Sequence, residues 1–244
     1  MRLQTMLHTV FPPECLSCAE RVEDPFAICG TCWADTPFIL GASCDICGTG
    51  LPGQTSPADE TLVCSECEAT PRPWSKGRAV FGYQGVGRKL VLALKHGDRA
   101  DIARAAGPWL ARAGADLLHE NPLIVPIPLH WTRLARRRFN QAALLSWSMA
   151  RNAPIPLEVE PMALLRLRPT PSQEGKDRDA RHQNVNESLV AHPRRGGVLN
   201  RRNVVLVDDV MTSGATFAAA AEACLAAGAE KVSVLALARV GRDT

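Results

Sequence analysis

The stretch VVLVDDVMTSGAT, residues 204–216, decides which fold the chain can adopt. Four apolar residues are followed by two adjacent acids, Asp208 and Asp209, and then by small and hydroxyl residues around Gly214. The apolar run predicts a buried strand, and its carboxyl end is where open α/β sheets bind their ligands. The small residues predict a turn into the N-terminus of a helix, so a ligand site is expected between the strand and the helix.

The residue types of this stretch suit a ribose that carries a phosphate. Free N–H groups at a helix N-terminus, together with hydroxyl side chains, favour a phosphate monoester. The two acids suit the hydroxyl pair of a ribose, and no Walker A or GxGxxG spacing is present. An ordinary strand, turn and capped helix with solvent-facing acids is the alternative. The predicted binding residues are Asp208, Asp209, Thr212, Ser213, Gly214, Ala215 and Thr216.

Strands and helices are expected to alternate around this stretch. Apolar runs predict strands over residues 79–85, 123–129, 161–168, 204–209 and 231–240. Helical periodicity predicts helices over residues 86–96, 100–118, 141–152 and 215–229. Such alternation indicates an α/β fold with a largely parallel sheet and flanking helices.

Eight of the nine cysteines form four CxxC pairs, and this regularity predicts metal binding. Two CxxC turns can place four thiolates around one structural zinc ion, so about two Zn²⁺ per chain are expected. Pairing of consecutive turns is preferred, and a cross-braced pairing is the alternative. Cys224 stands alone in an alanine-rich run and is expected to be a buried helix residue. The predicted ligands are Cys15, Cys18, Cys29, Cys32, Cys44, Cys47, Cys64 and Cys67.

Composition and charge predict two domains, residues 1–72 and 73–244, which meet near the proline-containing segment ATPRPWS. The 244 residues are 46% apolar, which is enough for a sizeable core. No charged segment followed by a long apolar run is present, so a cytoplasmic protein without membrane insertion is expected. The net charge of +3 hides opposed blocks: residues 1–75 carry 3 basic and 10 acidic side chains, whereas residues 131–202 carry 14 basic and 6 acidic ones.

The basic block is expected to meet phosphate groups. Arginine side chains bind phosphates in a bidentate manner, and Phe139 or Trp131 could stack on a base. A solvated charged face is the alternative. Lys95, Arg133, Arg136, Arg137 and Arg138 are therefore predicted to contact a pyrophosphate or a nucleic-acid backbone, with further arginines at positions 166, 168, 178 and 181.

Residues 204–216 resemble the PRPP-binding signature of type I phosphoribosyltransferases, and the whole chain resembles the ComF family of competence-type proteins. The likeness includes the double zinc ribbon, LKHGDRADIAR, VPIPLHWTRLARRRFNQA and LLRLRPTPSQEGKDRDARHQNV. The resemblance implies a type I phosphoribosyltransferase-like fold. It also implies that Asp208 and Asp209 hold the ribose hydroxyls, that residues 212–216 hold the 5-phosphate, and that Mg²⁺ binds with the pyrophosphate.

Two positions depart from the pattern that the resemblance implies. Arg138 stands where family members usually have glycine, and Thr212 stands where several purine enzymes of the superfamily keep an acid that assists the base. No general base or acceptor is therefore identified, and no catalytic residue is assigned.

Three functions stay open at this point. The preferred hypothesis is a PRPP-binding ComF-type protein that acts in DNA uptake or natural transformation, or that handles incoming single-stranded DNA together with DNA-uptake or recombination proteins. The second is an active phosphoribosyltransferase that acts on an unidentified base or amine in nucleotide metabolism. The third is a non-catalytic PRPP sensor.

Overall fold

A four-stranded parallel sheet forms the centre of the molecule. The computed structural model describes residues 12–51, 53, 61–96, 99–167 and 189–241. The strand order is β1-β6-β5-β2, and every neighbouring pair is parallel. The strands are β1 (Lys76–Gly82), β2 (Leu123–Pro126), β5 (Asn203–Met211) and β6 (Lys231–Arg239). Burial on both faces explains the apolar runs of β2, β5 and β6, and the predicted parallel sheet is confirmed.

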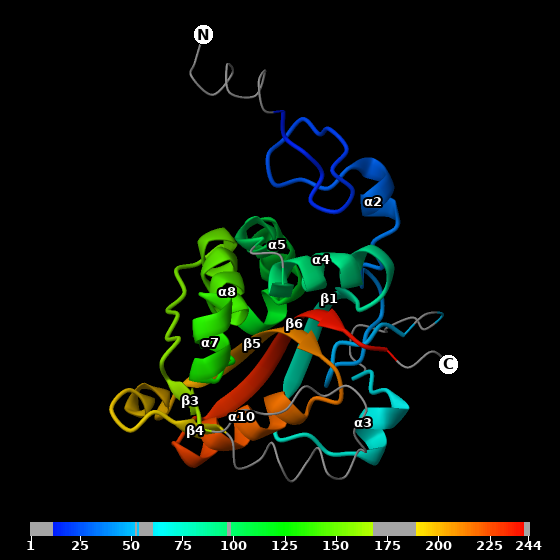
Figure 1. The fold of residues 1–244 in the computed structure, drawn as a ribbon. Helices are drawn as coiled ribbons and strands as arrows, with labels where there is room; N and C mark the ends of the chain where they lie inside the picture. The colour runs from blue at the N-terminus through cyan, green and yellow to red at the C-terminus, as the bar shows by residue number, and fades with distance from the viewer. Residues whose placement is uncertain (1–11, 52, 54–60, 97–98, 168–188, 242–244) are drawn as a thin grey trace.

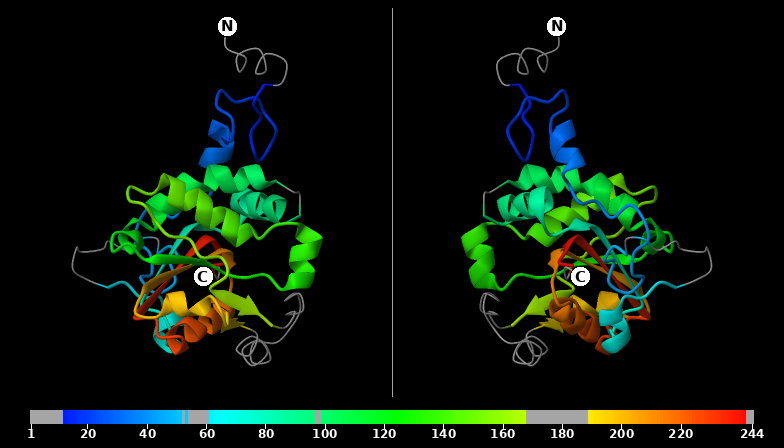
Figure 2. Two further views of the ribbon diagram at one scale, coloured as in Figure 1. Left: turned by 90° about the vertical axis from the view of Figure 1, so that its left-hand side faces the viewer. Right: turned by 90° about the vertical axis from the view of Figure 1, so that its right-hand side faces the viewer.

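Helices cover both faces of this sheet (Figure 1). Figure 2 shows one helix layer above the sheet and another below it in both side views. The upper layer contains α4 (Gly85–His96), α5 (Ala100–Ala113) and α8 (Gln141–Asn152). The lower layer contains α10 (Ala215–Ala226), whose alanine-rich face packs closely on the strands. No helix among the described residues is long and apolar enough to cross a membrane.

The strand expected over residues 79–85 lies three residues earlier, as β1, and two other segments differ more. The helix expected over residues 100–118 divides at Gly114 into α5 and the short α6 (Ala115–Leu118). The strand expected over residues 161–168 is reduced to β3 (Leu164–Arg166), which pairs with β4 (Leu189–Ala191) outside the central sheet. Only Leu164 of this strand is fully buried, so β3 packs over α10 on one side instead of entering the doubly covered sheet.

Short elements complete the described chain. They are α2 (Gly30–Ala34), α3 (Ser65–Ala69), α7 (Trp131–Arg137) and the 3₁₀ turn η1 (Gly196–Leu199). Helix α7 was not predicted, because its residues were interpreted only as a basic run. In Figure 2 it stands at the side of the body, away from the central sheet.

The Cys-rich segment crosses the edge of the sheet at β1, from one face to the other. Phe38 forms a bridge with Phe81, and the Ile39 N–H donates to the Val80 carbonyl at 2.9 Å. The chain before this point packs with the α4, α5 and α8 layer, whereas the chain after it packs with α10. The two halves of the Cys-rich segment therefore lie on opposite faces of the sheet.

Candidate functional site

The turn between β5 and α10 leaves the start of α10 open to a ligand. Gly214 is the N-cap of α10, and as a glycine it has no side chain that could cap the helix. The first N–H groups of a helix have no partner within the helix, so an uncapped N-terminus is suited to an anion. Thr212 is exposed, Ser213 and Thr216 are half-buried, and Ala215 is buried. Ala215 can therefore offer only its backbone, whereas the three hydroxyl residues are within reach of solvent.

The two acids lie on the last part of β5, next to this turn. The Asp209 N–H donates to Asp208 Oδ1 at 2.8 Å, and Asp209 is buried. Lys95 Nζ on α4 lies 3.0 Å from Asp209 Oδ1. Burial and the neighbouring Asp209 charge raise the pKa of Asp208 to about 7, although Lys95 and Arg166 oppose the shift. The structure thus brings the predicted Lys95 to the predicted acids.

Two arginines that the sequence did not single out support the turn from beneath. Arg72 Nη1 donates to the Ser213 carbonyl at 2.8 Å. Arg239 at the end of β6 donates to the Thr212 carbonyl and, at 3.3 Å, to the Met211 carbonyl. A charged residue that ends an otherwise apolar strand was the available signal for Arg239. Arg72 lies in the proline-containing segment where the domain boundary was predicted, and it offered no such signal.

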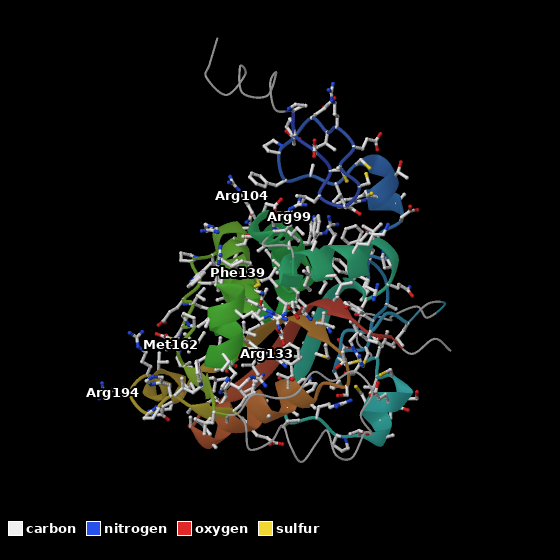
Figure 3. The ribbon with its side chains drawn as sticks, in the orientation of Figure 1. Arg99, Arg104, Arg133, Phe139, Met162 and Arg194 are labelled. Atoms are coloured by element: carbon white, nitrogen blue, oxygen red, sulfur yellow. The ribbon has the colours of Figure 1, made fainter. Side chains whose placement is uncertain are left out.

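The arginines of α7 separate into inner and outer positions. Arg133 and Arg137 are half-buried, and Arg137 Nη1 donates to Gln141 Oε1 at 3.3 Å. Arg136 and Arg138 are exposed. Figure 3 shows Arg133 in the middle of the view, over the sheet between α7 and α10. The predicted basic group therefore does not act as one surface.

Arg166 interacts electrostatically with Asp208, and Arg133 and Arg137 continue this series of neighbouring charges. Burial lowers the pKa of Arg166 on β3, the Asp208 carboxylate opposes this shift, and the Arg133 charge adds to it. Arg166 Nε also donates to the Pro128 carbonyl at 2.9 Å. Burial, and then the Arg137 charge, lower the pKa of Arg133. Positive charge thus gathers beside Asp208. The predicted arginines at positions 168, 178 and 181 lie outside the described residues.

Helix α7 also carries an exposed aromatic ring. Trp131 is 71% exposed, whereas Phe139 is half-buried, so Trp131 is the better placed of the two predicted stacking residues. Arg138 adopts a left-handed conformation with φ of 65° at the C-cap of α7. This conformation favours glycine.

The eight paired cysteines form two clusters. One contains Cys15, Cys18, Cys29 and Cys32, the other contains Cys44, Cys47, Cys64 and Cys67, and the sulfur atoms of each lie within 4.8 Å of one another. This arrangement confirms the pairing of consecutive turns over the cross-braced one. Cys224 is buried in α10, as expected.

The donor sets fit a tetrahedral zinc ion. The Cys18 and Cys29 sulfurs are 3.7 Å apart, and the Cys47 and Cys64 sulfurs are 3.8 Å apart. A tetrahedron with Zn–S bonds of about 2.3 Å has sulfur–sulfur edges of about 3.8 Å. The Cys64 N–H donates to the Cys44 sulfur at 3.3 Å, and a hydrogen bond from Cys47 leads the causes that lower the pKa of Cys44 to about 4. A thiolate ligand is favoured there.

Comparisons with known proteins agree with this architecture. Residues 6–68 match the family described as a double zinc ribbon domain. The chain is also similar to a solved structure of glutamine phosphoribosylpyrophosphate (PRPP) amidotransferase from B. subtilis. That similarity has 25% identity, covers 57% of this chain and 26% of the other, and has a TM-score of 0.36, which is too low to bear on function.

Two curated relatives match almost end to end. DNA utilization protein YhgH of Escherichia coli K12 is 31% identical over 230 residues, which cover 86% of this chain and 97% of the relative. Competence protein F of Haemophilus influenzae is 27% identical over 238 residues, which cover 96% of this chain and 93% of the relative. Because both matches run through the zinc ribbon and the parallel sheet together, the chain belongs to the ComF family, with YhgH and competence protein F.

Proposed function

We propose that this protein binds PRPP with Mg²⁺ at the carboxyl end of β5 and acts in the uptake or use of DNA. The observation that carries the proposal is the uncapped start of α10 directly beyond the Asp208 and Asp209 pair. Two acids suit the ribose hydroxyls, and the open helix N-terminus suits the 5-phosphate.

The remaining charged groups fit the rest of PRPP. Lys95 and Arg166 lie near the acids, Arg133 lies near Arg166, and the three charges would neutralise the pyrophosphate. Mg²⁺ would bind with the pyrophosphate oxygens, since this ion keeps much of its water and seldom uses an all-protein cage. Ribose 5-phosphate and pyrophosphate should therefore depend on different residues.

Calorimetric titration tests this division of the site. Thr216→Val should weaken the binding of ribose 5-phosphate and leave the binding of pyrophosphate with Mg²⁺ unchanged, because the substitution removes a hydroxyl from the turn alone. Arg133→Met should weaken the binding of pyrophosphate with Mg²⁺ and leave the binding of ribose 5-phosphate unchanged. Both variants should weaken PRPP. Absence of PRPP binding by the wild-type protein, or equal loss of both fragments in both variants, would contradict the assignment.

The DNA part of the proposal is supported by the relatives' names and by the outer face of α7. YhgH is named a DNA utilization protein and protein F a competence protein. Helix α7 carries both the exposed ring of Trp131 and the exposed Arg136, residue types that suit the bases and backbone of a single strand. DNA-uptake or recombination proteins are the expected protein partners.

Salt dependence of single-stranded DNA binding tests this face. Arg136→Ala should flatten the slope of log affinity against log salt by about 0.7, the value for one phosphate contact on a single strand. Arg151→Ala is the matched control, because Arg151 is exposed at the far end of α8. Equal slopes for the two variants, or no DNA binding at low salt, would exclude this face as the DNA site.

One observation favours a second candidate, a phosphoribosyltransferase that acts on an unidentified base or amine. A carboxyl group whose pKa is about 7, as for Asp208, is suited to general base catalysis at neutral pH. Release of pyrophosphate from PRPP, assayed over a panel of bases and amines, decides between turnover and a non-catalytic sensor. Turnover predicts release that Asp208→Asn abolishes, whereas a sensor predicts no release with any acceptor.

The proposal also includes the location and the domain division. Clusters of free thiols suit a reducing compartment, so we place the protein in the cytoplasm. We assign residues 1–72 to the zinc ribbon and residues 73–244 to the PRPP-binding domain.

A further inference from the structure

Glu66 joins the two arginines that lie beneath the phosphate-binding turn. Its Oε1 lies 3.3 Å from Arg72 Nη2, and its Oε2 lies 3.3 Å from Arg239 Nη2. Arg72 in turn donates to Ser213, and Arg239 donates to Thr212. One carboxylate therefore orients two guanidinium groups, each of which holds a carbonyl of the turn.

The three charges are nearly shielded from water. The side chains of Arg72 and Arg239 are each 4% exposed, and that of Glu66 is 18% exposed. The Nε atoms of both arginines have no hydrogen-bond partner among the described residues, whereas Arg239 Nη1 also donates to the Val240 carbonyl and Arg72 lies 5.6 Å from the centre of the Trp74 ring. Removing one member of a buried charge group is strongly destabilising, because it leaves the others without compensation. Glu66 is thus placed to control the geometry of both arginines.

Glu66 belongs to the second four-cysteine cluster. It lies on α3 between the ligands Cys64 and Cys67, so a metal ion that fixes these two cysteines also fixes the backbone of Glu66. Within the described part of this CxxC turn, Glu66 is the residue whose side chain pairs with both arginines. The contact from cluster to turn on this side therefore passes through one side chain.

The other CxxC turn of the same cluster reaches the phosphate-binding turn separately. Trp74 Nε1 donates to the Ile46 carbonyl, between Cys44 and Cys47, at 2.6 Å. The Trp74 ring lies directly below Gly214, because a Cβ built on Gly214 would be 3.1 Å from Cη2 of that ring. Both CxxC turns of the second cluster thus contact residues that support the turn.

The first four-cysteine cluster packs elsewhere. Its flanking Trp33 lies 6.1 Å from Trp109 on α5 between ring centroids, and Arg104 on α5 lies over the ring of Phe26 at 4.3 Å. These contacts are on the opposite face of the sheet from α10. The first four-cysteine site can therefore serve as an internal control, because these contacts are with α5 and not with the phosphate-binding turn.

We propose that the second four-cysteine site positions the phosphate-binding turn through Glu66, so that zinc at this site tightens PRPP binding. The inference rests on the proposed PRPP function and adds a positioning residue and a regulatory metal site to it. Because coupling between two binding equilibria is reciprocal, PRPP must also tighten zinc at the second site by the same factor. Zinc at the first site should not respond.

Glu66→Gln tests the positioning role in the zinc-loaded full chain. The lost carboxylate leaves more positive charge beneath the turn, which by itself would favour an anion. Weaker PRPP binding can therefore arise only from lost orientation, and a loss of about tenfold is expected from typical coupling strengths. Glu68→Gln is the matched control, because Glu68 is an exposed residue of the same helix. Unchanged or tighter PRPP binding by Glu66→Gln would overturn the inference.

The rate of zinc release to a coloured chelator tests the metal part. Cys32→Ser should keep zinc only at the second site, and PRPP should slow its release; Cys67→Ser should keep zinc only at the first site, and PRPP should have no effect. In Glu66→Gln with zinc at both sites, PRPP should slow zinc release from neither site. Equal protection of both sites by PRPP would refute the coupling while leaving PRPP binding itself intact. Failure of the wild-type chain to bind PRPP would instead remove the proposed function and this inference together.

Discussion

Replacement of Gly214 by alanine should damage the phosphate-binding turn from beneath. Gly214 has a φ of 80°, a left-handed conformation that costs an alanine roughly 1–2 kcal/mol. The new Cβ would also lie 3.1 Å from Trp74 Cη2 and 3.3 Å from Arg72 Nη1, so the turn or its support must shift. The methyl group would point into this support and not toward the ligand, so the ligand would be affected through displacement of the turn.

The net stability change is smaller than the strain. Alanine restricts the unfolded chain more than glycine does, which offsets about 0.4–1 kcal/mol. We therefore expect Gly214→Ala to lower the free energy of unfolding in urea by about 1 kcal/mol or more, and to weaken PRPP at least about tenfold, since two supports of the turn move.

Gly85→Ala separates strain from ligand binding. Gly85 also has a positive φ, 51°, at the start of α4, but the nearest atom to its built Cβ is the Asp35 carbonyl oxygen at 3.6 Å. This variant should lose comparable stability and keep wild-type PRPP affinity in calorimetry. If both variants retain PRPP affinity, the turn around Gly214 does not hold the phosphate.

Three further predictions concern separate parts of the molecule. Asp208→Asn should stabilise the protein more at pH 8 than at pH 4 in urea titrations. The reason is that the pKa of Asp208 is about 7 in the folded state, against an ordinary value of 3.8. The stability contributed by the bound proton is therefore fully present below about pH 4 and is lost as the pH rises through 7. No pH dependence of the difference would show that Asp208 titrates normally. Arg138→Gly should raise the free energy of unfolding by about 0.5–1 kcal/mol, because it relieves a left-handed arginine, and a lower midpoint would contradict this. Elemental analysis should find about two zinc ions per chain in the wild type and in Cys224→Ser, but about one in Cys44→Ser, and metal-free wild-type protein would exclude the zinc clusters.

The elements that carry the ligand site could be predicted because their signals are local. Strand β5, the start of α10 and the eight paired cysteines each follow from residues that are adjacent in the chain. Burial on both faces of the sheet produces an apolar run, and a tight CxxC turn requires only four residues. The same locality explains why α8 was predicted with its observed bounds.

The support of the site could not be predicted because it is assembled from distant residues. Glu66 and Arg239 are 173 positions apart and meet only when the Cys-rich segment folds over the end of β6. Arg72 was predicted only to lie at the domain boundary, yet its side chain donates to the Ser213 carbonyl, 141 positions further along the chain. Helix α7 escaped prediction for a different reason: none of its residues is buried, so it has no apolar periodicity.

Titration of the zinc-loaded protein with PRPP and Mg²⁺, compared with the Asp208→Asn, Asp209→Asn double variant, tests the central claim most directly. The amides keep the shape of the carboxylates but lose the charge, and hydrogen bonds to charged groups are worth about 1.5–3 kcal/mol each. We predict saturable binding of one PRPP per wild-type chain and a loss of about 100-fold or more in the double variant, with unchanged secondary structure. Binding that the double variant retains at wild-type strength, or no binding by the wild type, would contradict a PRPP site at the end of β5.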